Sequence, residues 1–215
     1  DLENPNSHEK ALSKTMNPKL HPTLLRPTLF SVALICVQVA LTQPLQAEPA
    51  ADAVNHYRTG YELLQSKDFR NAAIELEQAV QIDSTYGDAH YALGMAHASL
   101  QDFDKSAMSL EAALRQGTSR EELAQRIPRL LGDLYFKAAL KSRKQRRYGE
   151  AIERFGNSLT YRPGNAQAHF SIGTCHLQLR QPDKAQAAFE AAIKADAKYK
   201  WPYVSLGNIH RRAGE

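Results

Sequence analysis

The sequence contains little cysteine. Of its 215 residues, two are cysteine, Cys36 and Cys175. Cys36 lies in a segment that we expect to be removed from the mature chain, which leaves Cys175 without a disulfide partner. A disulfide framework is therefore excluded as the source of stability, and a chain of this length can bury an adequate core without one.

The short motifs that mark common catalytic sites are absent. The sequence has no glycine-rich phosphate loop, no Gly-x-Ser-x-Gly, no His-Glu-x-x-His and no Cys-x-x-Cys. We therefore expect no enzymatic activity from these residues, and no cofactor or bound metal. A longer gene product could still add a catalytic domain.

No apolar run reaches the roughly 20 residues that a membrane-spanning helix needs. The longest run, residues 28–42, follows Lys19 and Arg26 with no acid between them, and small residues follow it. This order predicts a cleaved secretory signal peptide over 16–47, with residues 1–15 upstream or disordered. An uncleaved anchor is the alternative. The mature chain would be periplasmic in a bacterium, or secreted, would meet a membrane only transiently, and would have no nucleic-acid partner.

What the chain does contain is an internal repeat. Similar segments begin at His56, His90, Tyr135 and His169, and a fifth begins at Tyr203. The spacing is 34 residues except between the second and third segments, where it is 45, so that step holds 11 extra residues. Repetition at a fixed period of this length is the signature of a stacked repeat architecture.

Small and bulky residues recur in register within these segments. One position is small in every segment: Gly60, Gly94, Ala139, Gly173 and Gly207. Later positions alternate small, bulky and small residues: Ala72, Leu76 and Ala79; Ser106, Leu110 and Ala113; Ala151, Phe155 and Ser158; Ala185, Phe189 and Ala192. A glycine inside a helix costs about 1 kcal/mol relative to alanine. Its repetition therefore indicates that two helices approach closely at this position.

The pattern resembles the tetratricopeptide-repeat (TPR) family, over about residues 53–215. The resemblance implies an all-α fold, a right-handed superhelical solenoid of antiparallel helix pairs with four full repeats and a half repeat. After a linker at 48–52, the expected boundaries are 53–86, 87–120, 132–165, 166–199 and a partial unit at 200–215, with an insertion at 121–131. The family's tryptophan at the head of the first helix is replaced by His or Tyr.

The insertion predicts an extra element between the second and third repeats. Ser119 with Glu122 three residues later has the spacing of a capping box. We therefore expect a short helix from Ser119 to Arg126 and a break or kink near Pro128. The segment is either a longer connection or a bulge that marks a binding region.

The histidines and Cys175 are expected to be structural. His90 and His97 lie seven residues apart, as do His169 and His176. That spacing separates them by about 10.5 Å along a helix, which is too far to share one metal ion. A pH-sensitive interface is the alternative role for the histidines.

Two surfaces are candidate binding sites. In TPR proteins the first helices of the repeats line a concave groove, which implies the following groove residues here: Tyr57, Tyr61, Tyr91, Met95, Phe136, Phe170, Trp201 and Asn208. Aromatic rings offer large contact areas to a peptide, although some of these rings could instead pack between repeats. The chaperone-type TPRs that clamp a C-terminal carboxylate use Lys and Asn in these rows, and Asn208 alone matches.

Charge is divided along the chain. Residues 48–115 hold 5 Lys and Arg against 11 Asp and Glu, a net charge of −6, whereas residues 116–215 hold 18 against 9, a net charge of +9. The basic residues that form the second candidate surface are Lys141, Arg143, Lys144, Arg146, Arg147, Arg211 and Arg212. They are either a solvated helix end or a docking patch for an acidic protein, an anionic polymer or a membrane surface.

Together these features predict an exported scaffold or adaptor that binds a partner peptide or protein through a TPR groove. The alternative is the N-terminal TPR region of a larger envelope enzyme or secretion machine. Neither the identity of the partner nor the oligomeric state is written in the sequence.

Overall fold

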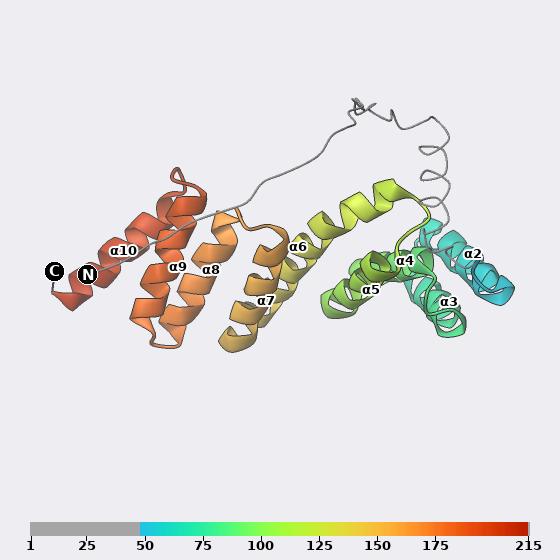
Figure 1. Cartoon of the computed structure of the whole chain (residues 1–215). Helices are drawn as coiled ribbons and strands as arrows, with labels where there is room; N and C mark the ends of the chain where they lie inside the picture. Colours follow the sequence, from blue (N-terminus) through green and yellow to red (C-terminus); the bar gives the residue numbers. More distant parts are fainter. Residues whose placement is uncertain (1–47, 215) are drawn as a thin grey trace, which may run out of the picture. The chain divides into compact units, whose positions relative to one another are not determined.

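The computed structural model describes residues 48–214, and every regular element in that part of the chain is an α-helix. The helices are α2 (Ala51–Gln65), α3 (Phe69–Ile82), α4 (Gly87–Ser99), α5 (Phe103–Gln116), α6 (Glu121–Lys144), α7 (Tyr148–Tyr161), α8 (Ala166–Gln178), α9 (Pro182–Ala195) and α10 (Lys200–Ala213). They form the pairs α2–α3, α4–α5, α6–α7 and α8–α9, and α10 packs on α9 (Figure 1). This confirms an all-α repeat fold with four helix pairs and a half repeat. The right-handed sense of the superhelix stays a prediction.

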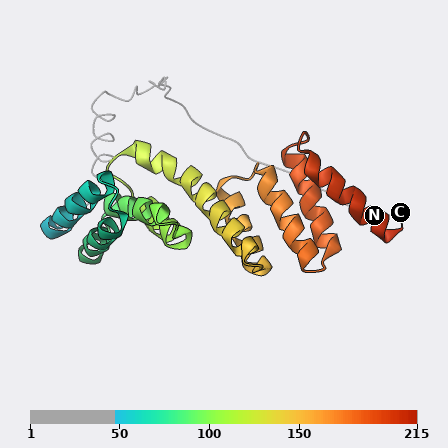
Figure 2. The ribbon, with the colours of Figure 1, turned by 180° about the vertical axis from the view of Figure 1, so that it is seen from behind.

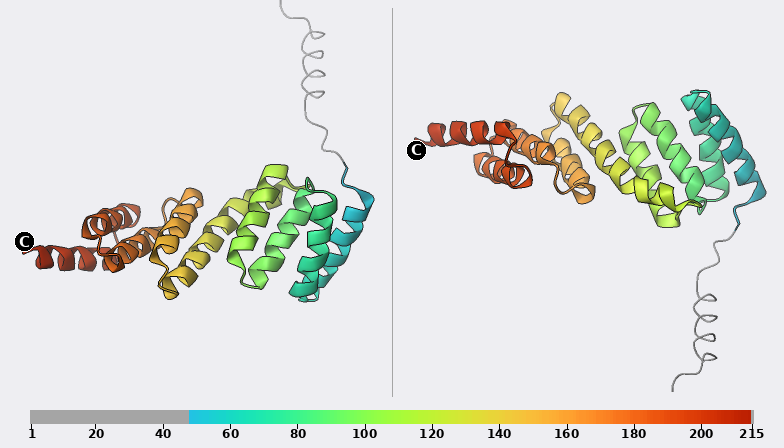
Figure 3. Two further views of the ribbon diagram at one scale, coloured as in Figure 1. Left: turned by 90° about the horizontal axis from the view of Figure 1, so that it is seen from below. Right: turned by 90° about the horizontal axis from the view of Figure 1, so that it is seen from above.

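Each helix packs mainly on its neighbours in the sequence. The contacts run α2 to α3, α3 to α4 and onward to α10, with a smaller contact between α2 and α4 (Figures 2 and 3). None of these helices is long and apolar enough to cross a membrane. The expected signal peptide at 16–47 and the residues before it lie outside the described residues and stay predictions.

The small-residue register lies where the two helices of a pair touch. A Cβ atom added to Gly94 would stand 2.8 Å from Cδ2 of Leu110, and one added to Gly173 would stand 2.5 Å from Cε1 of Phe189. Leu110 and Phe189 are buried. The bulky side chain of the second helix therefore fills the space that a side chain on the first would need, which confirms the predicted close approach.

The turn inside each pair has the same backbone conformation. One non-glycine residue in each turn adopts a left-handed φ of 59° to 65°: Lys67, Gln101, Arg146 and Arg180. The next residue donates its N–H back across the turn, as Asp68 does to the carbonyl of Leu63 at 2.9 Å. Such a bond satisfies a carbonyl that the helix end leaves free. The same bond closes the turn of all four helix pairs.

Adjacent pairs are joined by a hydrogen bond that recurs at the head of the first helix. His90 Nε2 donates to the carbonyl of Ser84 at 2.9 Å, and Tyr203 Oη donates to the carbonyl of Ala197 at 3.1 Å. His169 makes the same contact to a carbonyl six residues back, at 3.2 Å. Three of the residues that replace the family's tryptophan therefore tie their repeat to the end of the repeat before it. The other two bond elsewhere, Tyr135 to Glu111 and His56 to Glu75.

The insertion does not form a separate helix, so this expectation was wrong. Helix α6 runs without interruption from Glu121 to Lys144 and contains Pro128. The residue before it, Arg120, makes no side-chain cap, and Ser119 bonds to Asp88 instead of closing a capping box. The first turns of α6 therefore lengthen the first helix of the third repeat, and they run beyond the end of α7 in Figure 1.

Candidate peptide-binding site

Four of the predicted groove residues meet in one pocket of about 370 Å³. Tyr57 and Tyr61 come from α2, and Tyr91 and Met95 come from α4. The other lining residues are Leu64, Gln65, Phe69, Ala92, Ser99, Arg120, Leu123 and Arg126. The volume lies within the range of about 300–1,000 Å³ that is usual for ligand pockets. Four of the predicted groove residues therefore share one pocket, and their role in binding a partner stays a prediction.

Aromatic contacts hold one wall of this pocket in place. The Tyr57 ring lies 6.0 Å from the Tyr61 ring and 5.1 Å from the Tyr86 ring, measured between centroids. Tyr57 is half-buried and packs on the core shared by α2, α3 and α4, whereas Tyr61 is 41% exposed. Tyr57 thus anchors the wall, and the Tyr61 ring is the more exposed of the two.

Two charged groups, Asp88 and Arg120, act on the Tyr57 phenol at the pocket wall. Burial raises the pKa of the Tyr57 phenol, and the carboxylate of Asp88 raises this pKa further, while the guanidinium of Arg120 lowers it. The Tyr57 hydroxyl therefore stays protonated at neutral pH and can donate a hydrogen bond. No acidic residue is among those that line this pocket.

Phe136 and Phe170 serve the core of their own repeats. The Phe136 ring meets the buried Phe155 ring edge-on at 5.3 Å. Phe170 lies 5.5 Å from both Phe189 and Tyr199. Phe136 and Phe170 are both half-buried in these contacts. They therefore pack within the solenoid, which was the alternative to lining the groove.

Trp201 and Asn208 do not line this pocket, which we call the tyrosine pocket after Tyr57, Tyr61 and Tyr91. Trp201 is 63% exposed and lines a different pocket of about 740 Å³, together with Arg162, Asn165 and Tyr199. Asn208 is exposed, and its Oδ1 accepts a hydrogen bond from Arg211 Nη2 at 2.8 Å. A binding role for these two residues stays a prediction.

The predicted basic patch is divided by local contacts. Arg147 pairs with Glu150 at 3.1 Å, and Arg143 turns toward Ser171 on α8 at 3.4 Å. The remaining exposed cations at this end of α6 are Lys141, Lys144 and Arg146. Cations at a helix C-terminus favour the helix dipole. The side chain of Arg212 lies outside the described part of the chain.

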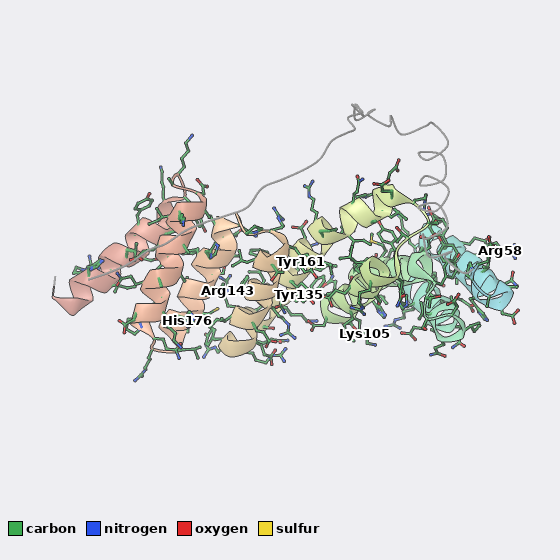
Figure 4. The ribbon with its side chains drawn as sticks, in the orientation of Figure 1. Arg58, Lys105, Tyr135, Arg143, Tyr161 and His176 are labelled. Carbon is green, nitrogen blue, oxygen red and sulfur yellow. The ribbon has the colours of Figure 1, made fainter. Side chains whose placement is uncertain are left out.

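A polar junction between the second and third repeats was not predicted. Tyr135 on α6 and Tyr161 on α7 stack with centroids 6.2 Å apart and ring planes 8° from parallel (Figure 4). Both hydroxyls donate to Oε1 of Glu111 on α5, at 2.7 and 3.2 Å. Burial and this hydrogen bond raise the pKa of Tyr135. The three residues are far apart in the sequence, and no spacing rule would have paired them.

His97, His176 and Cys175 have surroundings that suit a structural role. His97 is buried with Nε2 3.7 Å from Glu77, and burial lowers its pKa. His176 Nδ1 lies 2.8 Å from Gln181 Oε1. Cys175 is fully buried, and burial raises the pKa of its thiol. No group of residues within 48–214 is arranged to hold a metal ion.

Several solved structures are similar to this chain, and no curated protein sequence matches it. A crystal structure of MamA protein is 22% identical, covers 69% of this chain and 77% of its own, and has a TM-score of 0.43. The structure of MamA from residue 41 to its end, from Desulfovibrio magneticus RS-1, is 17% identical. It covers 78% of this chain and 88% of its own, and its TM-score is 0.44. The structure of YrrB, described as a TPR protein with an unusual peptide-binding site, is 17% identical. It covers 73% of this chain and 92% of its own, and its TM-score is 0.35.

The helix pairs and their repeated contacts define the class of this protein as an α-helical repeat solenoid. Two family models, both described as tetratricopeptide repeat, match residues 57–121 and 142–205. Together they cover more than half of the sequence, and the chain belongs to the tetratricopeptide-repeat family. Solenoids of this kind use extended surfaces to bind other proteins, so the general function is that of a protein-interaction scaffold.

Proposed function

We propose that this protein is an exported scaffold that captures a peptide segment of a partner protein between its first two repeats. The observation that carries the proposal is the tyrosine pocket, where Tyr57, Tyr61, Tyr91 and Met95 converge from α2 and α4. Rigid aromatic rings and an adaptable methionine are common at peptide-binding surfaces. The remaining predicted surfaces lack a comparable gathering of apolar side chains.

Replacing both Tyr61 and Met95 with alanine is expected to weaken peptide capture at least ten-fold. Loss of a central aromatic anchor at an interface commonly costs about 2 kcal/mol. Tyr61 is 41% exposed, so its removal should change the unfolding free energy by only about 0.5 kcal/mol. The measurement is selection of phage-displayed random dodecapeptides on the immobilised full chain, followed by titration of the selected peptides.

Trp201→Ala is the matched control, because it removes an exposed aromatic residue that lies in a different pocket. The control should keep the affinity of the parent chain. If the selected peptides bound equally well to the Tyr61 and Met95 variant, peptide capture in the tyrosine pocket would be wrong. Equal loss in the Trp201 variant would move the binding site to the later repeats.

Export is supported by the order of basic, apolar and small residues over 16–47. When the full chain is expressed in a bacterium, we expect the periplasmic fraction to contain a product that begins at Glu48. Leu34→Arg places a charge inside the apolar run and should leave the uncleaved chain in the cytoplasm. Amino-terminal sequencing of both fractions tests this, and an uncleaved, membrane-bound product would show an anchor instead.

A further inference from the structure

The insertion before the third repeat is docked as a rigid part of the solenoid. Within the first turns of α6, the side chains of Leu123, Ile127 and Leu131 are buried at successive spacings of four residues. Ile127 and Leu131 share a core with Leu110 of α5. A helix side that is buried over three turns is fixed in position by its packing.

The start of this segment is also held by polar contacts. The carboxylate of Asp88, at the head of α4, accepts hydrogen bonds from both the backbone N–H and the hydroxyl of Ser119, the former at 2.9 Å. Asp88 itself is buried. Beside it, Gly87 lets the carbonyl of Gly117 approach its Cα closely. The connection from α5 to α6 therefore has little freedom to move.

This fixed segment completes the tyrosine pocket. It contributes Arg120, Leu123 and Arg126 to a lining otherwise built by α2, α3 and α4. The two guanidinium groups add two positive charges to a lining that contains no carboxylate. Asp88, the acidic residue whose charge acts on Tyr57, is already engaged by Ser119. The pocket is therefore basic even though the first two repeats carry a net negative charge.

The spacing of the two arginines defines what they can bind. Arg126 lies inside α6, whereas Arg120 stands just before its first residue with an extended backbone. Their Cα atoms are therefore separated by roughly 10 Å along the helix axis. An extended peptide advances about 3.3 Å per residue, so two carboxylates two or three residues apart would match the spacing. Because the arginines are separated in this way, they suit two acidic side chains better than one terminal carboxylate.

We propose that the extension of α6 makes the pocket selective for an internal peptide segment in which two acidic side chains flank an apolar or aromatic residue. The carboxylates pair with Arg120 and Arg126, and guanidinium groups hold carboxylates with good geometry. The apolar residue lies against the rings of Tyr57, Tyr61 and Tyr91. This specificity rests on the proposed capture of a peptide in the same pocket.

The test compares phage-displayed dodecapeptides selected on three full-length proteins. These are the parent chain, the double variant Arg120→Gln with Arg126→Gln, and a control with Arg115→Gln and Arg129→Gln, exposed arginines that are not in the pocket lining. Peptides from the parent and the control should be at least five-fold enriched in paired Asp or Glu flanking an apolar residue. On the double variant this acidic enrichment should fall to the library background while the apolar enrichment remains.

Titration of one selected peptide then separates the contribution of its acidic side chains from that of its apolar residue. Replacing its two acids by Gln or Asn should weaken binding to the parent at least ten-fold and change binding to the double variant little. Thermal unfolding of the double variant should match that of the control, so that a loss of binding reflects the charge.

Three results would overturn the inference. These are acidic enrichment that persists on the double variant, selected peptides without acids, or displacement of the peptide by polyglutamate as readily as by the unlabelled peptide. In each case apolar peptides could still bind and the proposed function would stand. Failure of any peptide to be enriched on the parent chain over the Tyr61 and Met95 variant would reject both proposals.

Discussion

Gly87→Ala is expected to lower the free energy of unfolding by about 3 kcal/mol. A Cβ atom at this position would lie 1.4 Å from the carbonyl oxygen of Gly117, well inside contact distance. The obstacle is backbone, so the connection between α5 and α6 must shift, and overpacking of this kind costs about 1–3 kcal/mol or more. The shift also disturbs the bonds between Ser119 and Asp88. Circular dichroism should show a melting temperature lower by about 10 °C.

Gly156→Ala is the matched control for this substitution. Gly156 lies inside helix α7, and an added Cβ would meet no atom within 4 Å. Alanine is favoured over glycine inside a helix by about 1 kcal/mol, so this variant should melt at the same or a higher temperature. A Gly87 variant as stable as the control would show that the α5–α6 connection is not held as described.

Phe155→Ala should destabilise the third repeat by about 3–5 kcal/mol, the usual cost of truncating a buried phenylalanine. Its ring is completely buried and lies in a core with Ala139, Ala151 and Ala168. Those neighbours are small and cannot extend into the vacated space. Urea unfolding followed by circular dichroism measures the loss.

Met108→Ala provides the comparison for Phe155. Met108 is 68% exposed on α5, so its truncation should change the unfolding free energy by no more than about 0.5 kcal/mol. A similar, small effect of both substitutions would contradict the position of Phe155 in the core.

The repeat architecture could be predicted because its signal is repeated. A single glycine such as Gly94 is weak evidence, but glycine or alanine at one position through five segments indicates a constant close approach of two helices. The partners Leu110 and Phe189 followed from the same register. The left-handed turn residue could not be predicted, because Lys67, Gln101 and Arg180 are not residue types that favour a positive φ.

The groove was predicted only in part, because a register does not say toward which neighbour a ring turns. Tyr91 and Phe136 occupy equivalent positions in their repeats. Tyr91 lines the pocket, whereas Phe136 meets Phe155. The difference depends on what the adjacent pair places opposite each ring. Arg120 and Arg126 were missed for a related reason, since their role depends on the path of the insertion.

The continuity of α6 differs from the prediction because an interior proline usually indicates a helix boundary. Pro128 removes the N–H that would bond to the carbonyl of Ala124, and an interior proline costs about 3 kcal/mol. The helix nevertheless continues, since Leu123, Ile127 and Leu131 bury one side of it. Their spacing of four residues was visible in the sequence and was the stronger signal.

Helix α6 has a consequence for how the molecule comes apart. In a stacked array, repeats can open one at a time from the ends, because each contacts only its neighbours. The N-terminal turns of α6 pack on the second repeat, whereas its C-terminal turns pair with α7. One continuous helix therefore belongs to two repeats. Unfolding that starts at either end of the array cannot pass α6 without opening both of these repeats together. We expect the second and third repeats to behave as a single cooperative unit, with the outer pairs opening independently around it.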